Sequence, residues 1–220
     1  MLIALHNPRT AGGSLNSALM MQFGTKLFFN PDERPNPLDP TLVPEGTEAI
    51  TTFQPITLMS KAPGDAWVTS LRDPVERIVD LFNFFALPDP LLGEKMTKRE
   101  YVTPSEVYHR KAQDMLEYDN GMVRRIAGVS PQFGRVTPEH LDLAKENLAK
   151  FDEVFFQSTF DADYAAAAAK YGWTAVPDLW NSISIEVRPV SFYSKHIAAI
   201  TEANSLDIAL VEYARELRGV

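Results

Sequence analysis

The chain has 220 residues, 45% of them hydrophobic, which suits a single domain over residues 1–220 with a sizeable core. It contains no cysteine, so disulfides, thiolate metal sites and cysteine nucleophiles are excluded, and a reducing cytoplasm is the expected location. The formal net charge of −8 argues against nucleic acid or an anionic membrane as a partner. No apolar run approaches the length that spans a bilayer, and residues 1–5 predict a strand rather than a signal peptide.

Short apolar runs alternate with helical patterns along the chain. Continuous apolar runs predict strands that are buried on both faces. They lie at residues 2–5, 49–53, 66–71 and 154–157. Helical spacing of apolar residues predicts helices at residues 14–23, 74–85, 103–116, 121–127, 137–150 and 161–171, and two more within residues 191–217. This alternation implies a parallel sheet, in which ligands bind at the carboxyl ends of the strands.

Capping residues and prolines mark the ends of several elements. Residues 73–76, Asp-Pro-Val-Glu, combine an N-cap, a proline at the first helical position and a capping box. Asp161 and Ser205 are the expected N-caps of two later helices. Five prolines within residues 30–44 exclude a regular helix or a central strand there, and they predict a surface loop.

The segment that joins the first strand to the first helix has the parts of an oxyanion-binding site. It comprises residues 6–15, HNPRTAGGSL. Gly12 and Gly13 are expected to adopt positive φ and to let the backbone approach a ligand. Arg9 adds a planar cation, and the hydroxyls of Thr10 and Ser14 add hydrogen-bond donors. The helix N-terminus behind them favours negative charge.

A plainer interpretation of the same segment is a glycine turn with Arg9 in solvent. The segment is not the common nucleotide P-loop, because that pattern, G-x-x-x-x-G-K-[ST], requires a lysine where Gly13 stands. An enzyme that uses a metal-bound triphosphate is therefore disfavoured.

A second segment places an arginine at the same edge of the sheet. It comprises residues 68–77, VTSLRDPVER. Arg72 ends the strand and precedes the helix, so its guanidinium is expected on the ligand side, where it can hold a phosphate bidentately. Asp73 is expected to cap the helix rather than to act in catalysis. Arg77 either pairs with Asp73 or Glu76 along the helix or is solvated.

Both segments resemble those of a known family. The first is similar to the 5′-phosphosulfate loop of the Golgi-type (family 2-like) and related bacterial sulfotransferases, H-x-P-K-T-[AG]-[GS]-[TS]-[ST], with Arg9 at the lysine position. The second is similar to the family's 3′-phosphate segment, R-D-P-x-x-R-x-x-S. Weaker matches follow in the family's order at residues 119–128, 144–151, 160–164 and 204–210. The resemblance implies an α/β fold with a P-loop NTPase-like parallel sheet flanked by helices and a helical C-terminal part.

The resemblance also implies a reaction and a donor site. The reaction is transfer of a sulfuryl group from 3′-phosphoadenosine 5′-phosphosulfate (PAPS) to a hydroxyl of a saccharide or small metabolite, with no metal. Arg9 is the implied catalytic residue, because a cation there stabilises the leaving phosphate and the transferring group. For Arg124 and its neighbour Arg125, a salt-bridged helix face is the alternative. The implied donor-binding residues are Pro8, Arg9, Thr10, Ala11, Gly12, Gly13, Ser14, Leu15, Arg72, Asp80 and Arg124.

One position departs from the family pattern in a way that bears on the donor. Asp80 stands where the pattern has the serine that shares the 3′-phosphate. A carboxylate repels a phosphate, so three explanations are open. Asp80 turns away and pairs with a cation, or the donor lacks the 3′-phosphate, or the site has lost its function.

The general base is the second departure. Residues 51–55, TTFQP, correspond to a family segment that often carries a histidine or glutamate, but they hold no titratable side chain. His6 is expected to orient the loop, which leaves Asp80 and Glu45 as possible substitutes. Three further histidines are expected at the surface or beside helix caps: His109, His140 and His196.

Three functions follow, in order of preference. The first is an active PAPS-dependent sulfotransferase. The second is a catalytically inactive nucleotide-binding or scaffold protein of the same fold, which Asp80 and the absent base favour. The third is a phosphoryl-transfer enzyme, which the missing P-loop lysine disfavours.

Overall fold

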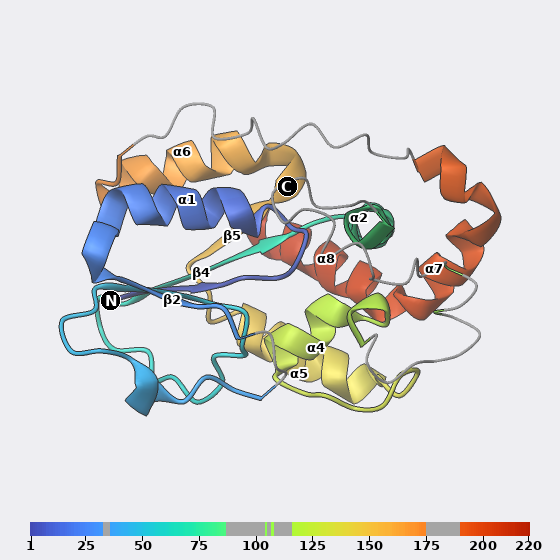
Figure 1. Cartoon of the computed structure of the whole chain (residues 1–220), viewed down its shortest axis with the longest axis horizontal. Helices are drawn as coiled ribbons and strands as arrows, with labels where there is room; N and C mark the ends of the chain where they lie inside the picture. The colour runs from blue at the N-terminus through green and yellow to red at the C-terminus, as the bar shows by residue number, and fades with distance from the viewer. Residues whose placement is uncertain (33–35, 87–103, 105–106, 108–115, 175–189) are drawn as a thin grey trace.

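The computed structural model describes residues 1–32, 36–86, 104, 107, 116–174 and 190–220. Its centre is a parallel sheet with the strand order β2-β3-β1-β4-β5 (Figure 1). The strands are β1 (Leu2–Leu5), β2 (Leu27–Asn30), β3 (Ala49–Thr52), β4 (Ala66–Leu71) and β5 (Glu153–Phe156). The expected parallel α/β architecture is therefore confirmed.

β1 is the middle strand and is buried on both faces. It pairs with β3 on one side and β4 on the other, so Leu2 lies between Ala49 and Ala66. Successive side chains of a strand point to opposite faces. Accordingly Ile3 and Leu5 belong to one hydrophobic core, whereas Leu2 and Ala4 belong to the other.

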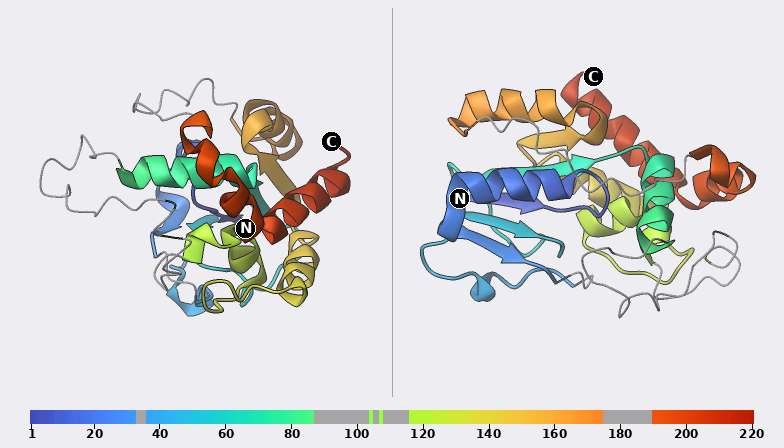
Figure 2. Two further views of the ribbon diagram at one scale, coloured as in Figure 1. Left: turned by 90° about the vertical axis from the view of Figure 1, so that its right-hand side faces the viewer. Right: turned by 45° about the horizontal axis from the view of Figure 1, so that its top comes forward.

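Helices cover both faces of the sheet and extend beyond one end. On one face lie α1 (Gly12–Phe23) and α6 (Phe160–Tyr171), side by side in Figure 1. On the other face lie α4 (Gly121–Ala127), α5 (Pro138–Leu148) and α8 (Ser205–Arg218). A third core joins α2 (Pro74–Ala86) to α7 (Ile197–Ala203), and Figure 2 shows these two helices beyond the carboxyl end of β4. Among the described residues, no helix combines the length and the apolar character needed to cross a membrane.

Short 3₁₀ helices complete the described chain. They are η1 (Gly24–Lys26), η2 (Pro40–Leu42), η4 (Leu116–Tyr118), η5 (Gln157–Thr159) and η6 (Val190–His196). The described part of the proline-rich segment after β2 forms the expected loop, apart from η2. The loop is anchored at Leu38, which is fully buried and whose amide donates to the carbonyl of Pro55 over 2.8 Å.

Several element boundaries differ from those predicted. The strand β2 was not predicted, because its four residues form the sheet edge, are half-exposed and show no alternation of polar and apolar side chains. α1 begins at Gly12, two residues before the expected start. Asp73 does cap α2, since its Oδ1 accepts the Glu76 amide over 2.9 Å. The helix expected at residues 103–116 lies almost entirely outside the described residues.

Two predicted caps are wrong for different reasons. α6 begins at Phe160, so Asp161 lies inside its first turn and is not the N-cap. α8 begins at Ser205, but the oxygen that caps it belongs to the residue that precedes α4. Oδ1 of Asn120 accepts the amides of Leu206 and Asp207 over 2.9 and 3.0 Å. The cap is therefore supplied from far along the sequence.

The capping of α4 and α8 is reciprocal. Asn120 precedes α4 and caps α8, while Asp207 in the first turn of α8 caps α4. The Asp207 carboxylate accepts the amides of Met122 and Val123 over 3.1 and 2.8 Å. Because each helix satisfies orphan amides of the other, their relative position is fixed by hydrogen bonds as well as by packing.

This reciprocity predicts a difference between two substitutions. Asn120→Gly keeps the left-handed backbone, with φ of 51°, at no steric cost, but leaves the part-buried amide of Leu206 and the buried amide of Asp207 without this acceptor. We expect a loss of about 2 kcal/mol in the free energy of unfolding, measured by urea denaturation. Ser205→Ala, the control at the exposed residue that the sequence favours as cap, should change it by less than about 0.5 kcal/mol. Equal losses in the two variants would contradict the reciprocal cap.

Candidate functional site

The candidate site lies where the strand order reverses beside β1. The chain runs from β1 to β2 and β3 on one side of the sheet, and then crosses to β4 and β5 on the other. Ligands of open parallel sheets bind at the carboxyl ends of the strands at such a point. Residues 6–11, which follow β1, meet Arg72, which follows β4, at this edge.

The loop after β1 has an unusual backbone. Arg9 and Ala11 adopt positive φ of 65° and 78°, whereas Gly12 and Gly13 do not. The expected positive φ of the two glycines is thus wrong, because both belong to the first turn of α1. Within the described chain, no well-formed hydrogen bond takes up the backbone amides of residues 9–13. Successive free amides in such a turn form a nest that suits an anion.

The two glycines have different surroundings. A Cβ on Gly12 would overlap the imidazole of His6, far inside van der Waals contact. A Cβ on Gly13 would have no atom within 4 Å, and Gly13 is exposed. Gly12 therefore accommodates a side chain of the protein, while Gly13 faces open space at the start of α1.

The side chain of His6 is buried, fills interior space and is uncharged at neutral pH. Its ring stacks on Phe53 with centroids 4.1 Å apart. Asn16 accepts the Thr51 hydroxyl and directs its amide nitrogen to Nδ1 of His6 over 3.2 Å, which places the ring proton on Nε2. Burial, followed by the positive charges of Arg125 and Arg9, lowers the pKa of His6 from 6.5 to about 3. The expected role of His6 in orienting the loop fits these contacts.

The polar side chains of the loop brace it against β4. The Thr10 hydroxyl, expected to face a ligand, is buried and donates to the Asn7 carbonyl over 2.8 Å. It also lies 2.9 Å from the hydroxyl of Ser70. Nδ2 of Asn7 donates to Thr69 and to the Ser70 carbonyl, both over 3.0 Å. Thr10 thus shapes the loop and presents no donor outward.

The remaining loop positions divide between the interior and the surface. Leu15 is buried in the core beneath α1. The carbonyl of Pro8 accepts Nε of Arg77 over 3.0 Å. Ser14 is half-buried, and its hydroxyl forms no hydrogen bond with the described residues, so it can meet a ligand at the helix start. Ala11 supplies the left-handed turn that starts the helix.

Arg9 and Arg72 converge on one oxygen atom. Nε of Arg9 and Nη1 of Arg72 lie 2.8 and 2.9 Å from the same Oδ2 of Asp80. The guanidinium of Arg9 also lies over the exposed ring of Phe84, 4.8 Å from its centroid. Side-chain exposures of 35% for Arg9, 20% for Arg72 and 15% for Asp80 place the cluster at the surface. Asp80 therefore pairs with cations, as the first of the three explanations expects, but it does not turn away from the site, because its partners are the two site arginines themselves.

Arg72 also contacts a backbone carbonyl and a second carboxylate. Its Nη1 approaches the Arg9 carbonyl at 3.4 Å, which ties the strand end to the loop. Its Nε lies 3.6 Å from a carboxylate oxygen of Glu76, a half-exposed ion pair one helical turn before Asp80. Glu76 therefore faces Arg72. The charge of Arg72 is shared between two carboxylates.

Three other arginines are structural. Arg77 is fully buried and bonds to Pro8 and Glu117, so neither interpretation made from its helical neighbours is right. Arg124, expected at the donor, is buried and bonds to Asp119 and to the carbonyls of Pro131 and Gln132. Arg125 bonds to Glu117 and to the Phe53 carbonyl. These contacts match the salt-bridged alternative for Arg124 and Arg125.

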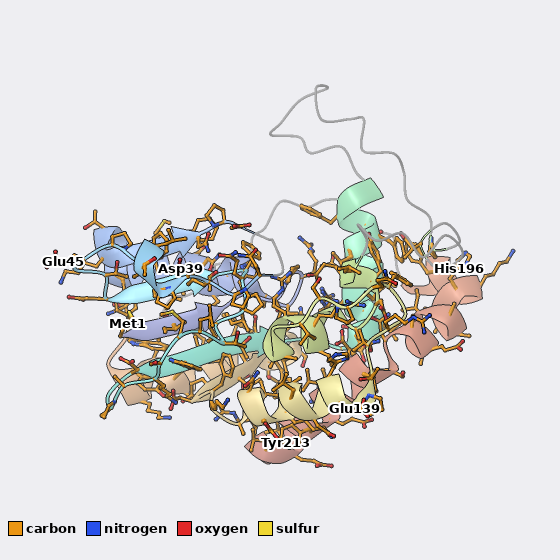
Figure 3. All side chains as sticks on the ribbon, turned by 90° about the horizontal axis from the view of Figure 1, so that it is seen from below. Met1, Asp39, Glu45, Glu139, His196 and Tyr213 are labelled. Carbon is orange, nitrogen blue, oxygen red and sulfur yellow. The ribbon has the colours of Figure 1, made fainter. Side chains whose placement is uncertain are left out.

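The candidate bases other than Asp80 lie elsewhere or have other partners. Glu45 precedes β3 and lies near Met1 at the amino end of the sheet, opposite the site (Figure 3). His140 completes the capping box of α5, because its Nδ1 accepts the Thr137 amide over 3.0 Å. His196 precedes α7 at the far end of the molecule (Figure 3), and His109 lies outside the described residues. No group of three metal-ligating side chains forms within the described ranges.

Neither a known protein family nor a curated protein matches this sequence. The functional interpretation therefore depends on the geometry of the site and on the resemblance of the two segments. Sequence reasoning missed Asn7 and Phe84 as partners of the loop. An asparagine two residues after a buried strand was a usable signal, whereas a partner on a distant helix left none.

The glycine environments predict opposite outcomes for two alanine substitutions. Gly12→Ala should lower the free energy of unfolding by about 2 kcal/mol, because the added methyl group overlaps the His6 ring. Gly13→Ala should leave it unchanged or raise it by up to about 1 kcal/mol, since alanine favours the helix. Thermal and urea denaturation measure both. In the His6→Ala background Gly12→Ala should cost less, and an unchanged cost there would exclude the overlap as cause.

The buried His6 predicts a pH-dependent stability. The pKa of His6 is about 3 in the folded chain and near 6.5 in the unfolded chain. Between these two pH values His6 is therefore protonated in the unfolded chain and neutral in the folded chain. The contribution of His6 is present above pH 6.5 and is lost as the pH falls towards 3, by up to about 1.4 kcal/mol per pH unit.

The test compares wild type with His6→Phe between pH 7.5 and 4 by urea denaturation. The free energy of unfolding of wild type should fall relative to that of His6→Phe as the pH falls, because phenylalanine has no proton to bind. Burial raises the pKa of Asp207 to about 6, which acts in the opposite direction over part of this range. Its effect is common to both proteins and cancels in the comparison. A gap in stability between the two proteins that stays constant with pH would show that folding does not change the pKa of His6.

Proposed function

We propose that this chain is a sulfotransferase with a P-loop NTPase-like fold. It transfers a sulfuryl group from an adenosine phosphosulfate donor, PAPS by the resemblance, to a hydroxyl of a saccharide or small metabolite. The observation that carries the proposal is the convergence of Arg9 and Arg72 on one oxyanion position. That position adjoins the nest of free amides before α1.

The chemistry asks the chain to position groups and to neutralise charge. The bond between sulfur and the donor's phosphate oxygen breaks as a bond to the acceptor oxygen forms, and the nucleotide leaves with the bonding electrons. Both terminal nitrogens of Arg9 are without a hydrogen-bond partner among the described residues, so they can meet the oxygens on which charge develops. The amides at the start of α1 and the hydroxyl of Ser14 can hold the donor phosphate.

A second candidate function has its own support. Asp80 neutralises part of the charge of both arginines, and the chain offers no other described carboxylate in contact with Arg9 to take the acceptor proton. The Asp80 oxygen Oδ2 already accepts hydrogen bonds from both guanidiniums. These facts favour a protein that binds the nucleotide without turnover, and the two candidates differ in whether transfer occurs.

The decisive assay offers labelled PAPS and adenosine 5′-phosphosulfate to the protein with a panel of hydroxyl acceptors, with and without a metal chelator. We expect transfer that survives the chelator and that falls at least about 100-fold in Arg9→Ala, because a preorganised cation at the reacting group is lost. Arg135→Ala, at an exposed arginine outside the site, should transfer at the wild-type rate. Donor binding without transfer would support the second candidate, and absence of binding by well-folded protein would exclude both.

A further inference from the structure

The two oxygens of Asp80 have different environments. Oδ2 is taken up by Arg9 and Arg72 over 2.8 and 2.9 Å. Oδ1 forms no hydrogen bond with the described residues, although the side chain is only 15% exposed. A carboxylate oxygen is an acceptor only, so Oδ1 is an unfilled acceptor next to the anion nest.

The charge balance at this point limits what can bind. Arg9 and Arg72 bring two positive charges, and Asp80 removes one of them by direct contact. Glu76, 3.6 Å from Arg72, offsets more of the remainder. A single phosphate or phosphosulfate group at Arg9 and α1 suits this balance. A second phosphate, with a charge of roughly −1.5 to −2, would meet the Asp80 carboxylate, and among the described residues the two arginines in contact with Asp80 are already paired with it.

We propose that Asp80 selects a donor nucleotide that carries one anionic head group and a free hydroxyl on its ribose, and that it excludes a second phosphate at that hydroxyl. This inference rests on the proposed function and narrows its donor from PAPS to adenosine 5′-phosphosulfate or a nucleotide of that kind. The physical reason is complementarity. A carboxylate accepts a hydrogen bond from a ribose hydroxyl, whereas a free arginine is needed where the ribose is phosphorylated.

The orientation of Arg9 is part of the same arrangement. Because Nε of Arg9 is held by Asp80 and Cζ of Arg9 lies over the ring of Phe84, the terminal nitrogens have a fixed direction. A second phosphate could replace Asp80 between the arginines only by breaking two charge-assisted hydrogen bonds and turning the carboxylate out. Asp80 is therefore both a selecting group and a support for the cation.

Calorimetric titration at fixed salt with adenosine 5′-monophosphate and adenosine 3′,5′-bisphosphate tests the inference, because the two ligands differ only by a phosphate in place of a hydroxyl. Wild type should bind the monophosphate about 10-fold more tightly or better. Asp80→Ser should reverse the preference, since it frees both arginines. Asp80→Asn, which keeps the shape and removes the charge, should bring the two affinities close together. Glu146→Gln, at an exposed carboxylate of α5 outside the site, should keep the wild-type preference.

Each other outcome has a distinct meaning. If wild type prefers the bisphosphate, the inference is overturned while the proposed function stands. If neither nucleotide binds wild type or Asp80→Ser, and both proteins melt cooperatively, the proposed function is overturned and the inference with it. Should Asp80→Ser fail to fold, the wild-type preference and its change in Asp80→Asn still decide the question.

Discussion

A guanidinium that is removed from water must be neutralised and must use its hydrogen-bond donors, and in this protein that requirement falls on Arg77. Its side chain is fully buried, and it satisfies the requirement by joining parts of the chain that are distant in sequence. It bonds to the carbonyl of Pro8 in the loop after β1, pairs with Glu117, and lies 3.8 Å from the carboxylate of Asp207 in α8. Removing either carboxylate leaves the buried charge of Arg77 only partly compensated.

Glu117 extends this constraint to a second loop at the ligand edge. Its two oxygens bind Arg77 and Arg125, and Arg125 in turn holds the Phe53 carbonyl after β3. Burial would raise the pKa of Glu117, but the charges of Arg125 and Arg77 outweigh it and keep the pKa below its ordinary value. Gly121 is required beside this pair, since a Cβ there would lie 2.7 Å from the Glu117 carboxylate. The loops that form the candidate site are thus positioned by a charge network in the interior.

The sequence predicts the features that depend on residues close to one another along the chain. Apolar runs locate β1 and β4, and the residues at 73–76 locate the start of α2. The roles of the arginines depend on partners tens of residues away. Glu117 lies 40 positions from Arg77, a separation at which helical spacing carries no information. The cap of α8 comes from Asn120, 86 and 87 positions from the amides that it accepts, so Ser205 was the better local candidate and the wrong one.

The helix α2 contributes both a buried arginine and a carboxylate near the surface to the candidate site. One turn apart, Arg77 holds the carbonyl of Pro8 and Asp80 holds the side chain of Arg9, so α2 fixes two successive residues of the loop. Burial separates their tasks, because Arg77 is closed to any ligand while the Asp80 pair reaches the surface. From the sequence, Asp80 is an obstacle to an anionic ligand. In the structure its oxygen occupies the point where two arginines meet, so it marks the position of an oxyanion and limits the charge of any ligand that binds beside it.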